Sequence, residues 1–495
     1  MNVEKIKEMR TIILMLLVLF AINVTGQSQD ITSNLYETYN KYKEPTLNKR
    51  RGKYKDVQAL ITKLKENSKY TIATVGKSIE GRDLHLISIG SGKTNVFLWS
   101  QMHGNEPTAT QAIFDIINFL NSNDFKEEKE AILSSTTLHF LPMLNPDGAE
   151  RFTRRNMLGI DINRDALRLQ TPEGQTLKKV RDSLDADFGF NLHDQSTYYN
   201  AELTDKPATI SYLAPAYNYE KSVNKVRADA MRVIVFMNNI VQKYAPGQVG
   251  RYNDDFEPRA FGDNIQKWGT SAILIESGGY KNDIEKQEIR KLNYVSILSA
   301  IYTIANGNYK EISINDYEKI PHNDRKLFDL KIKGVTYNLM GKNYTIDLGI
   351  NHSEVDNENH TAFYNHSSII DQGDLSTYYG YTTFDASGYT LVEGTTFPSI
   401  LKTEVDLEKM DGFDLLKRGY TYIKMETLPA DKNDIKFPLH LVNSNLKLPK
   451  FGLFPGANPT FLLKKDEVIE YAVVNGFLIN LKTKENNFKN ALIYR

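Results

Sequence analysis

The sequence predicts an α/β protein, a three-layer sandwich around a mixed, mostly parallel sheet, which a mostly β domain follows. The first observation is that short apolar runs alternate with longer segments of helical periodicity between about residues 27 and 310. Such runs are typical of strands buried on both faces, and their alternation with helices is typical of a sheet between helical layers. The second observation is that, after about residue 317, β-branched and aromatic residues alternate with polar residues between turn signals.

The strands and helices of the first region follow one another in order. Strands are expected at the apolar runs 96–99, 138–141, 188–192 and 271–275. Helices are expected at residues 113–120, 171–184, 221–244 and 284–305, where apolar residues recur at intervals of three and four. Pro107 suits the first turn of the first helix, and Gly307 suits the end of the last one.

The C-terminal third carries turn signals rather than helical periodicity. The strongest is Asn475-Gly476, which separates two apolar runs and predicts a β-hairpin. Other turn signals are Gly341-Lys342-Asn343, Asp371-Gln372-Gly373-Asp374 and Ser387-Gly388. We therefore divide the chain into a signal peptide at residues 1–26, an α/β domain at 27–310 and a β-rich accessory domain at 318–495.

The signal peptide is predicted from basic residues that precede an apolar run at residues 12–24. This run is shorter than the ~20 residues that a transmembrane helix needs, and small residues follow it at a suitable cleavage position. We therefore expect an exported protein, periplasmic or extracellular, with no stable membrane anchor after cleavage. The sequence indicates no particular oligomeric state.

Composition excludes several classes of function. The 495 residues contain 61 Lys and Arg and 61 Asp and Glu, so the basic excess typical of a nucleic-acid or polybasic membrane binder is absent. The chain has no cysteine, which excludes disulfides, thiolate zinc sites and a cysteine nucleophile. A metal site would have to use His, Asp and Glu.

Two predicted strands end at residues that suit a metal site. His103 and Glu106 follow the first apolar run, and His193 follows another. Ligands of α/β sheets bind at such strand ends, and neutral imidazole and carboxylate groups suit Zn²⁺. A His-x-x-Glu spacing is nevertheless common by chance, and a lone strand-end histidine is more often a hydrogen-bonded polar residue than a ligand. On spacing alone, both interpretations stay open.

Further segments carry a resemblance to a known family. They are Ile79-Glu80-Gly81-Arg82-Asp83, Asn145-Pro146-Asp147-Gly148, Arg154-Arg155-Asn156, the stretch from Gly159 to Asp165, and Ile275-Glu276-Ser277-Gly278-Gly279. Together with the segments around His103 and His193, and in this order, they resemble the zinc carboxypeptidase family, the carboxypeptidase A-like metallopeptidases. The resemblance covers about residues 55–306 and implies an eight-stranded mixed sheet flanked by helices.

The resemblance also implies roles for individual residues. His103, Glu106 and His193 would hold one Zn²⁺ per chain, and Asp161 would orient a ligand histidine. Glu276 would be the general base and acid, which takes a proton from water and passes it to the leaving amine.

The substrate-binding residues follow from the same resemblance. Arg154 would stabilise the oxyanion, and we choose it over Arg155 because it lies seven residues before Asp161. Asn163 and Arg164 would bind the substrate's terminal carboxylate, for which the planar guanidinium is suited.

Two positions depart from the family pattern. Tyr252 is our candidate for the tyrosine that contacts substrate, although its spacing to Glu276 does not match cleanly. We also hypothesise that Arg259 lines the specificity pocket and favours an acidic terminal side chain, because it is a cation in the corresponding segment.

The function implied is that of a metallocarboxypeptidase that removes C-terminal residues from peptides with a free carboxylate. The first alternative is a related zinc amidohydrolase acting on cell-wall peptides or N-acyl amino acids. The second is a non-catalytic peptide- or glycan-binding protein in which the β-rich domain does the binding.

Overall fold

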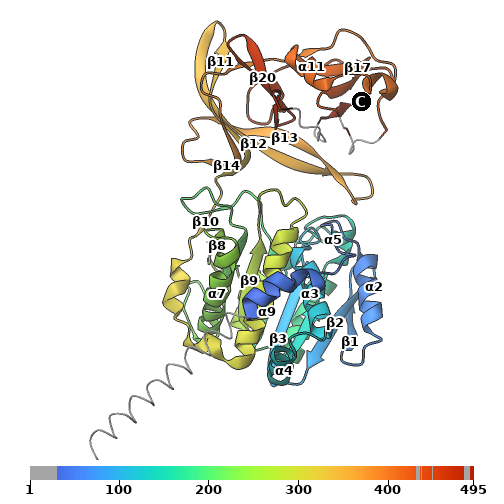
Figure 1. The fold of residues 1–495 in the computed structure, drawn as a ribbon. Helices are drawn as coiled ribbons and strands as arrows, with labels where there is room; N and C mark the ends of the chain where they lie inside the picture. Colours follow the sequence, from blue (N-terminus) through green and yellow to red (C-terminus); the bar gives the residue numbers. More distant parts are fainter. Residues whose placement is uncertain (1–30, 431–434, 436, 449, 484–490) are drawn as a thin grey trace, which may run out of the picture. The chain divides into compact units, whose positions relative to one another are not determined.

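The computed structural model describes residues 31–430, 435, 437–448, 450–483 and 491–495, which form two compact units (Figure 1). The first unit contains residues 31–202 and 206–324 of this part of the chain, and the second contains residues 203–205 and those from 325 onward. The expected signal peptide lies outside the described residues. Among the helices that the structure describes, none combines the length and the apolarity needed to cross a membrane.

A mixed sheet, eight-stranded within the described residues, forms the centre of the first unit. Its order is β1 (Thr71–Lys77), β2 (Asp83–Gly90), β4 (Thr136–Leu141), β3 (Thr94–Ser100), β5 (Phe188–Asp194), β9 (Ser271–Ser277), β7 (Ile210–Leu213) and β8 (Val249–Arg251). The central strands β4, β3, β5 and β9 are parallel to their neighbours in turn. The pairs β1–β2, β2–β4 and β7–β9 are antiparallel. The predicted mixed sheet is therefore confirmed, and the predicted apolar runs are its four central strands.

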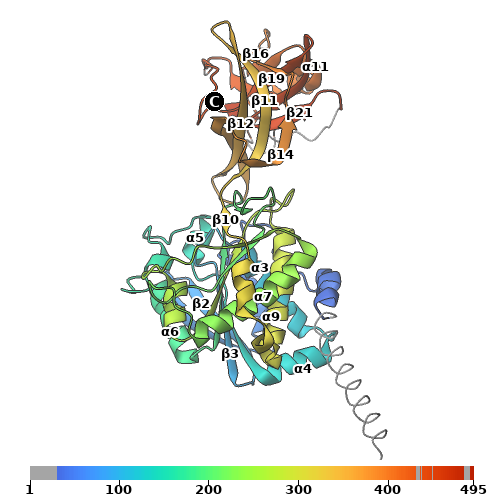
Figure 2. The ribbon, with the colours of Figure 1, turned by 90° about the vertical axis from the view of Figure 1, so that its left-hand side faces the viewer.

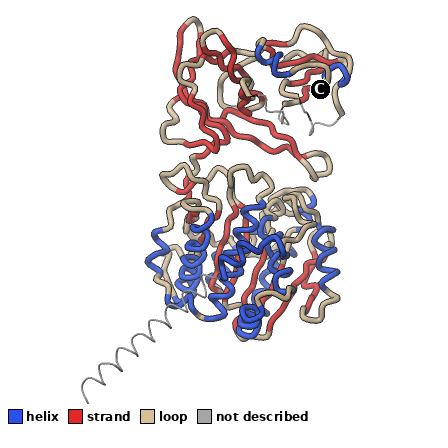
Figure 3. The backbone as a smooth tube through the Cα atoms, viewed as in Figure 1, coloured by secondary structure: helices blue, strands red, loops and turns tan. Residues whose placement is uncertain are grey.

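Helices cover both faces of this sheet, as Figures 2 and 3 show. The helices whose side chains join the larger apolar core are α2 (Tyr54–Leu64), α3 (Thr108–Asn121), α4 (Lys126–Ser135), α7 (Lys225–Tyr244) and α9 (Gln287–Asn306). The opposite face carries a smaller core with side chains from α6 (Pro172–Leu184) and α8 (Phe261–Lys267). The three-layer sandwich predicted from the sequence is thus the fold of the first unit.

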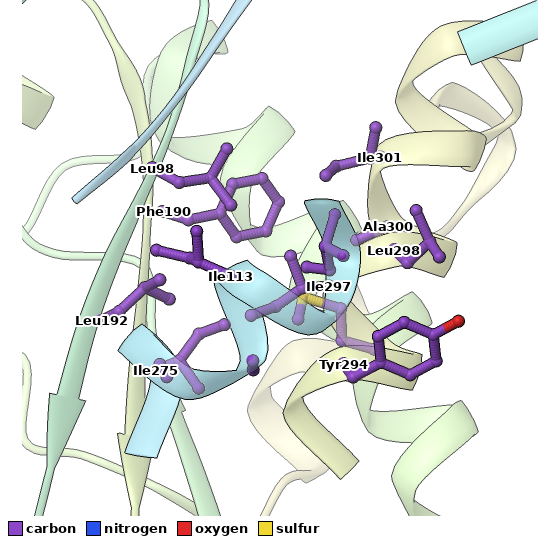
Figure 4. Close-up of a cluster of buried hydrophobic side chains, with 14 of the residues drawn as sticks. Leu98, Ile113, Phe190, Leu192, Ile275, Tyr294, Ile297, Leu298, Ala300 and Ile301 are labelled. Carbon is purple, nitrogen blue, oxygen red and sulfur yellow. The ribbon is translucent and has the colours of Figure 1, made fainter. Parts of the chain in front are cut away.

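Alternating side chains of the central strands enter the two cores. Leu98, Phe190 and Ile275 pack on the α3 and α9 side, together with Ile113 and Ile297 (Figure 4). The intervening residues Phe97, Trp99 and Ala272 belong to the opposite core. Because side chains of a strand alternate between faces, His193 and Glu276, which follow Leu192 and Ile275, point away from the α3–α9 core. This alternation places both polar side chains on one face of the sheet.

Two helices begin later than the sequence pattern predicts. Helix α7 begins at Lys225 rather than residue 221, because the Asn224 side chain accepts a hydrogen bond from the backbone N–H of Arg227. Helix α9 begins at Gln287 rather than residue 284, because Lys286 adopts a left-handed conformation with φ 52° just before it.

The N-terminal segment is attached to α3 and α9 through a buried ion pair. Asp115 and Arg290 are both fully buried and form a bidentate contact, with 2.7 Å between Nε and Oδ2. The Tyr39 hydroxyl and the Glu44 backbone N–H also donate to Asp115, at 3.0 and 2.7 Å. Because a buried charge is tolerated only when it is paired and hydrogen-bonded, this segment is part of the first unit's core.

The second unit is rich in strands, as predicted. Its larger sheet consists of β11 (Leu327–Leu339), β12 (Lys342–Asp356), β13 (Phe363–Gly373), β14 (Tyr379–Asp385), β15 (Thr390–Val392), β19 (Phe461–Lys465), β20 (Val468–Val474) and β21 (Phe477–Asn480). The smaller sheet consists of β16 (Thr395–Thr396), β17 (Tyr420–Met425), β18 (His440–Asn443) and β22 (Ile493–Tyr494). Asn475 and Gly476 both have positive φ between β20 and β21, so the predicted hairpin turn is confirmed.

Candidate metal centre

Two histidines and a glutamate converge at the ends of β3 and β5. His103 and Glu106 lie in the loop between β3 and α3, and His193 is the penultimate residue of β5. The Nδ1 atoms of the two histidines are 3.1 Å apart, and the Glu106 oxygens lie 2.9 Å from His103 Nδ1 and 2.8 Å from His193 Nδ1. All three residues are buried, and their donor atoms lie within 4.8 Å of one another, so the group could hold a metal ion.

The loop that carries His103 and Glu106 is held by a close backbone contact. A Cβ atom on Gly104 would lie 2.0 Å from the backbone carbon of Gly148, so only glycine fits there. Gly148 belongs to the short helix α5 (Pro146–Glu150), and the side chain of its N-cap residue Asn145 accepts a hydrogen bond from the Gly148 N–H at 2.9 Å. The Asn-Pro-Asp-Gly segment thus supports the loop by packing and makes no contact with the donor atoms among the hydrogen bonds of the described residues.

Asp161 fixes the orientation of the His103 ring. Its Oδ1 lies 3.1 Å from His103 Nε2 and also accepts a hydrogen bond from the Asn163 backbone N–H at 3.0 Å. When Nε2 donates its hydrogen to Asp161, the lone pair of Nδ1 faces Glu106 and His193. Burial alone would raise the pKa of Asp161, but the contacts with His103 and Arg154 hold it well below its usual range.

The protonation states fit a cation at the donor atoms. Burial lowers the pKa of His193, which favours the neutral imidazole that a metal requires. Burial would raise the pKa of Glu106, but His103 and His193 lower it, so Glu106 is a carboxylate. Burial would lower the pKa of His103, but the Glu106 and Asp161 carboxylates raise it, so a metal ion would displace a proton from this ring. Two imidazoles in their neutral form and a carboxylate would then form a donor set that suits Zn²⁺ and leaves a position for a further ligand.

Arg154 lies directly against these donor atoms. Its Nη1 is 3.1 Å from His103 Nδ1 and 3.2 Å from Glu106 Oε1, and its Nε donates to Asp161 Oδ2 at 3.1 Å. Arg155, by contrast, points to its own loop and donates to the Gly159 carbonyl. Of the two neighbouring arginines, Arg154 is therefore the one that reaches the centre.

Glu276 occupies the strand next to His193. The two residues are register partners in the parallel pair of β5 and β9. Burial raises the pKa of Glu276 well above its usual value, and the nearby Glu106 and Asp194 carboxylates raise it further. A carboxyl group beside candidate metal ligands is placed to accept and return a proton.

Tyr252 lies within electrostatic reach of Glu276. Burial raises the pKa of the Tyr252 hydroxyl, and the Glu276 carboxylate raises it further. The backbone N–H of Tyr252 donates to the Tyr212 carbonyl at 3.0 Å, and its ring stands edge-on to Tyr199 at 5.9 Å between centroids. Tyr199 is therefore a neighbour of the site that sequence reasoning did not identify.

Asn163 and Arg164 are positioned by the segment that precedes α8. Asn163 Oδ1 accepts a hydrogen bond from the Phe261 N–H at 2.9 Å. Arg164 is exposed, and its Nε lies 3.6 Å from Oε2 of Glu257. Arg259 also binds Glu257, through Nε and Nη2 at 3.1 Å each. Glu257, which the sequence analysis did not single out, thus lies between two candidate substrate-binding cations.

Comparison with known proteins shows what the segment that carries most of this site resembles. Residues 57–176, which include His103, Glu106 and Asp161, match the family model described as zinc carboxypeptidase. This segment of the chain is similar to the zinc carboxypeptidase family. The chain is 33% identical over 116 residues to Carboxypeptidase E of Caenorhabditis elegans, covering 19% of this chain and 25% of that protein. It is 29% identical over 109 residues to Carboxypeptidase D of Mus musculus, covering 18% of this chain and 8% of that protein. The matches therefore span a quarter or less of these relatives.

Solved structures of carboxypeptidases also align with this chain. A metallo-carboxypeptidase from Burkholderia cenocepacia aligns with a TM-score of 0.43 and 15% identity, over 52% of this chain and 69% of that one. A metallo-carboxypeptidase from Pseudomonas aeruginosa, in complex with (2-guanidinoethylmercapto)succinic acid, aligns with a TM-score of 0.41 and 17% identity, over 51% of this chain and 69% of that one.

Proposed function

We propose that the first unit is a zinc-dependent metallocarboxypeptidase that removes C-terminal residues from peptides. The observation that supports this most directly is the convergence of His103 Nδ1, His193 Nδ1 and the Glu106 carboxylate within 4.8 Å, with Glu276 on the adjacent strand. One Zn²⁺ per chain, held by these three residues, would polarise the scissile carbonyl and lower the pKa of a bound water from 15.7 to about 7.

Glu276 is the general base and acid in this proposal. Its carboxylate accepts a proton from the attacking water and later donates that proton to the nitrogen of the leaving amine. The position of Glu276 directly beside His193 on the adjacent strand supports this role, because a general base must lie within hydrogen-bond reach of the proton that it accepts.

Arg154 stabilises the negative charge that develops on the carbonyl oxygen. Its guanidinium already lies 3.1 Å from His103 Nδ1, so it is close enough to face a carbonyl bound at the same centre. Asp161 limits the movement of Arg154 because it accepts hydrogen bonds from that side chain. A cation held in place before the reaction stabilises developing charge more effectively than one that must be ordered during it.

Asn163 and Arg164 bind the terminal carboxylate of the substrate and so determine which bond is cut. The side-chain amide of Asn163 and the exposed guanidinium of Arg164 supply the donors, and Tyr252 supplies a further contact beside Glu276. Arg164 must exchange its contact with Glu257 for the substrate, and this exchange costs little because the pair is partly exposed.

A free carboxylate on the substrate also fits the alternative of a zinc amidohydrolase that acts on cell-wall peptides or N-acyl amino acids. In both cases we propose an exported enzyme, located in the periplasm or outside the cell. A non-catalytic peptide- or glycan-binding protein would not require Glu276 beside the donor atoms.

A panel of short peptides, N-acyl amino acids and wall peptides, assayed by mass detection, tests the proposal. We expect stepwise loss of C-terminal residues, which stops with a chelator and returns with added Zn²⁺. Hydrolysis of N-acyl amino acids alone would favour the amidohydrolase. Binding of peptides without cleavage, unaffected by the chelator, would contradict both enzymatic functions.

A further inference from the structure

Lys286 is a buried lysine next to the candidate site. It is 6% exposed, and its Nζ donates to the Ser277 carbonyl at 2.8 Å and to Asp194 Oδ2 at 3.2 Å. Neither contact involves the proposed zinc ligands. Sequence analysis missed this residue because it lay inside a segment expected to be the first turn of a helix.

The two partners of Lys286 end the two strands that carry the site. Asp194 follows His193 and is the last residue of β5, and Ser277 follows Glu276 and is the last residue of β9. Asp194 and Ser277 also form the last register pair of these strands. The ammonium group therefore links the last residue pair of β5 and β9, one residue beyond His193 and Glu276.

This ammonium is also a positive charge among acidic groups. Glu106 and Glu276 are both close enough to Asp194 and to each other for their charges to interact. Asp194 accepts a second hydrogen bond from the Thr108 hydroxyl at 2.6 Å. Buried like charges repel one another. A fixed cation at this position offsets that repulsion, and so it keeps the end of β9, which carries Glu276, close to Glu106.

The backbone of Lys286 supports a specific role for its side chain. Its φ of 52° and ψ of 35° lie in the left-handed region, which glycine or asparagine adopts at less cost than lysine. Lysine makes no side-chain cap for α9, since Asp283 accepts the N–H groups of Gln287 and Glu288 instead. The contacts of the ammonium group therefore explain why a lysine occupies this strained backbone position although it does not cap α9.

We propose that Lys286 is a positioning residue for Glu276, because its ammonium group fixes the end of β9 against the end of β5 and so holds the Glu276 carboxylate toward the donor atoms. This inference rests on the proposed function for its catalytic consequence. Its structural part, the fixing of the two strand ends, does not depend on any activity.

The principal test variant is the double substitution Lys286→Met with Asp194→Asn, which removes both charges. Lys286→Met alone leaves Asp194 buried without its cation and is expected to destabilise the unit. Lys286→Arg keeps the charge and the hydrogen-bond donors. Lys129→Met is the matched control, since Lys129 is also a buried lysine that donates to a backbone carbonyl, that of Ser122, but it lies on α4.

Two measurements are made on the zinc-loaded full chain. The first is amide hydrogen exchange, followed in peptides that cover residues 192–197 and 274–280. These peptides contain two amides that report on the strand ends, since the Gln195 N–H donates to the Ser277 carbonyl and the Gly278 N–H donates to the Thr209 carbonyl. We expect exchange at least about tenfold faster in the double variant than in the wild type and the control. The second is peptide hydrolysis, where we expect kcat to fall about 10- to 100-fold with KM within about threefold.

Lys286→Arg should recover kcat to within about fivefold of the wild type, because it restores the cation. Unchanged exchange at both strand ends, wild-type kcat in the double variant, or an arginine variant as impaired as the double variant would each overturn the proposal. If the wild-type chain cleaves no substrate, the proposed function is wrong, while the exchange rates still decide whether Lys286 fixes β9.

Discussion

His193 and Glu276 are directly paired residues on two adjacent parallel strands. One is a proposed metal ligand and the other the proposed base, so the separation between metal and base is set by the spacing of the sheet rather than by a loop. Strands of a buried sheet are held by hydrogen bonds on both sides, which makes their side chains well-ordered supports for a reaction. This relationship allows the metal-binding and proton-transfer roles to be separated by substitution.

The first prediction concerns that separation. Glu276→Gln should retain one zinc per chain and lose kcat by about 10²- to 10⁴-fold, because glutamine cannot transfer the proton. His193→Ala should instead lose zinc. Metal analysis of the dialysed proteins together with peptide hydrolysis checks both expectations. A near-normal kcat for Glu276→Gln would show that the base is a different residue.

The second prediction concerns Glu257, which lies 3.6 Å from Arg164. Glu257→Gln should lower KM by up to about fivefold without changing kcat, because the substrate carboxylate no longer competes with a partly exposed ion pair. Steady-state kinetics on one peptide measures this effect. A KM that stays the same or rises would mean that Arg164 does not bind the terminal carboxylate.

Arg259 can be tested with the same assay, on peptides that end in Glu, Lys and Phe. Our hypothesis predicts that the peptide ending in Glu is preferred and that Arg259→Ala removes the preference. The bidentate contact of Arg259 with Glu257 means that Glu257→Gln should strengthen the preference. Equal hydrolysis of the three peptides by the wild type would rule out this role for Arg259.

A fourth prediction concerns the pH dependence of the first unit's stability. Burial raises the pKa of Asp263 to about 7, whereas the pKa of an unfolded aspartate is about 3.9. The stabilisation that the bound proton gives is therefore present below about pH 4 and lost as the pH rises through 7. Asp263→Asn should raise the free energy of unfolding at pH 8 by about 1–4 kcal/mol and leave it unchanged near pH 4.

Tryptophan fluorescence during urea unfolding follows this unit selectively, because both tryptophans of the chain, Trp99 and Trp268, belong to it. Asp185→Asn is the matched control, since Asp185 is exposed in the same unit and should leave the pH dependence unchanged. Equal stability of Asp263→Asn and the wild type at pH 8 would contradict the prediction.

The sequence predicted the centre of the first unit better than its edges. Strands β3, β4, β5 and β9 are nearly continuous apolar runs because helices cover both of their faces, and such runs are visible without a structure. The edge strand β1 consists of partly buried and exposed residues and has no such signal. The strand ends also extend further than the apolar runs, which is why His193 and Glu276 lie within strands rather than after them.

Within the candidate site, the sequence predicted the residues whose own side chain, at the end of a strand, suggests a chemical role. Asp194 and Lys286 were not predictable, because their significance depends on a contact between segments 92 residues apart. The same holds for Glu257, which has no motif and acquires a role only through Arg164 and Arg259. Local patterns thus suggest candidate ligands and a candidate base, whereas the charged residues proposed to position them become visible only in the tertiary structure.

The last prediction concerns the second unit, whose core contains His440. Its Nδ1 accepts a hydrogen bond from the Leu492 N–H, and its Nε2 pairs with the Thr460 hydroxyl, each at 2.8 Å. Burial lowers the pKa of His440 to about 3, against about 6.5 in an unfolded chain. The stabilisation from the neutral ring is therefore complete above pH 6.5 and is lost as the pH falls toward 3.

We expect the second unit to lose about 1–3 kcal/mol of stability between pH 7 and pH 4, because the neutral ring must be protonated on unfolding. Hydrogen exchange of the β18 segment measures the loss, since tryptophan fluorescence reports on the other unit. His440→Gln should be less stable at pH 7 but should lose less stability on acidification than the wild type does. An acid-induced loss of the same size in His440→Gln would assign the pH dependence to other groups.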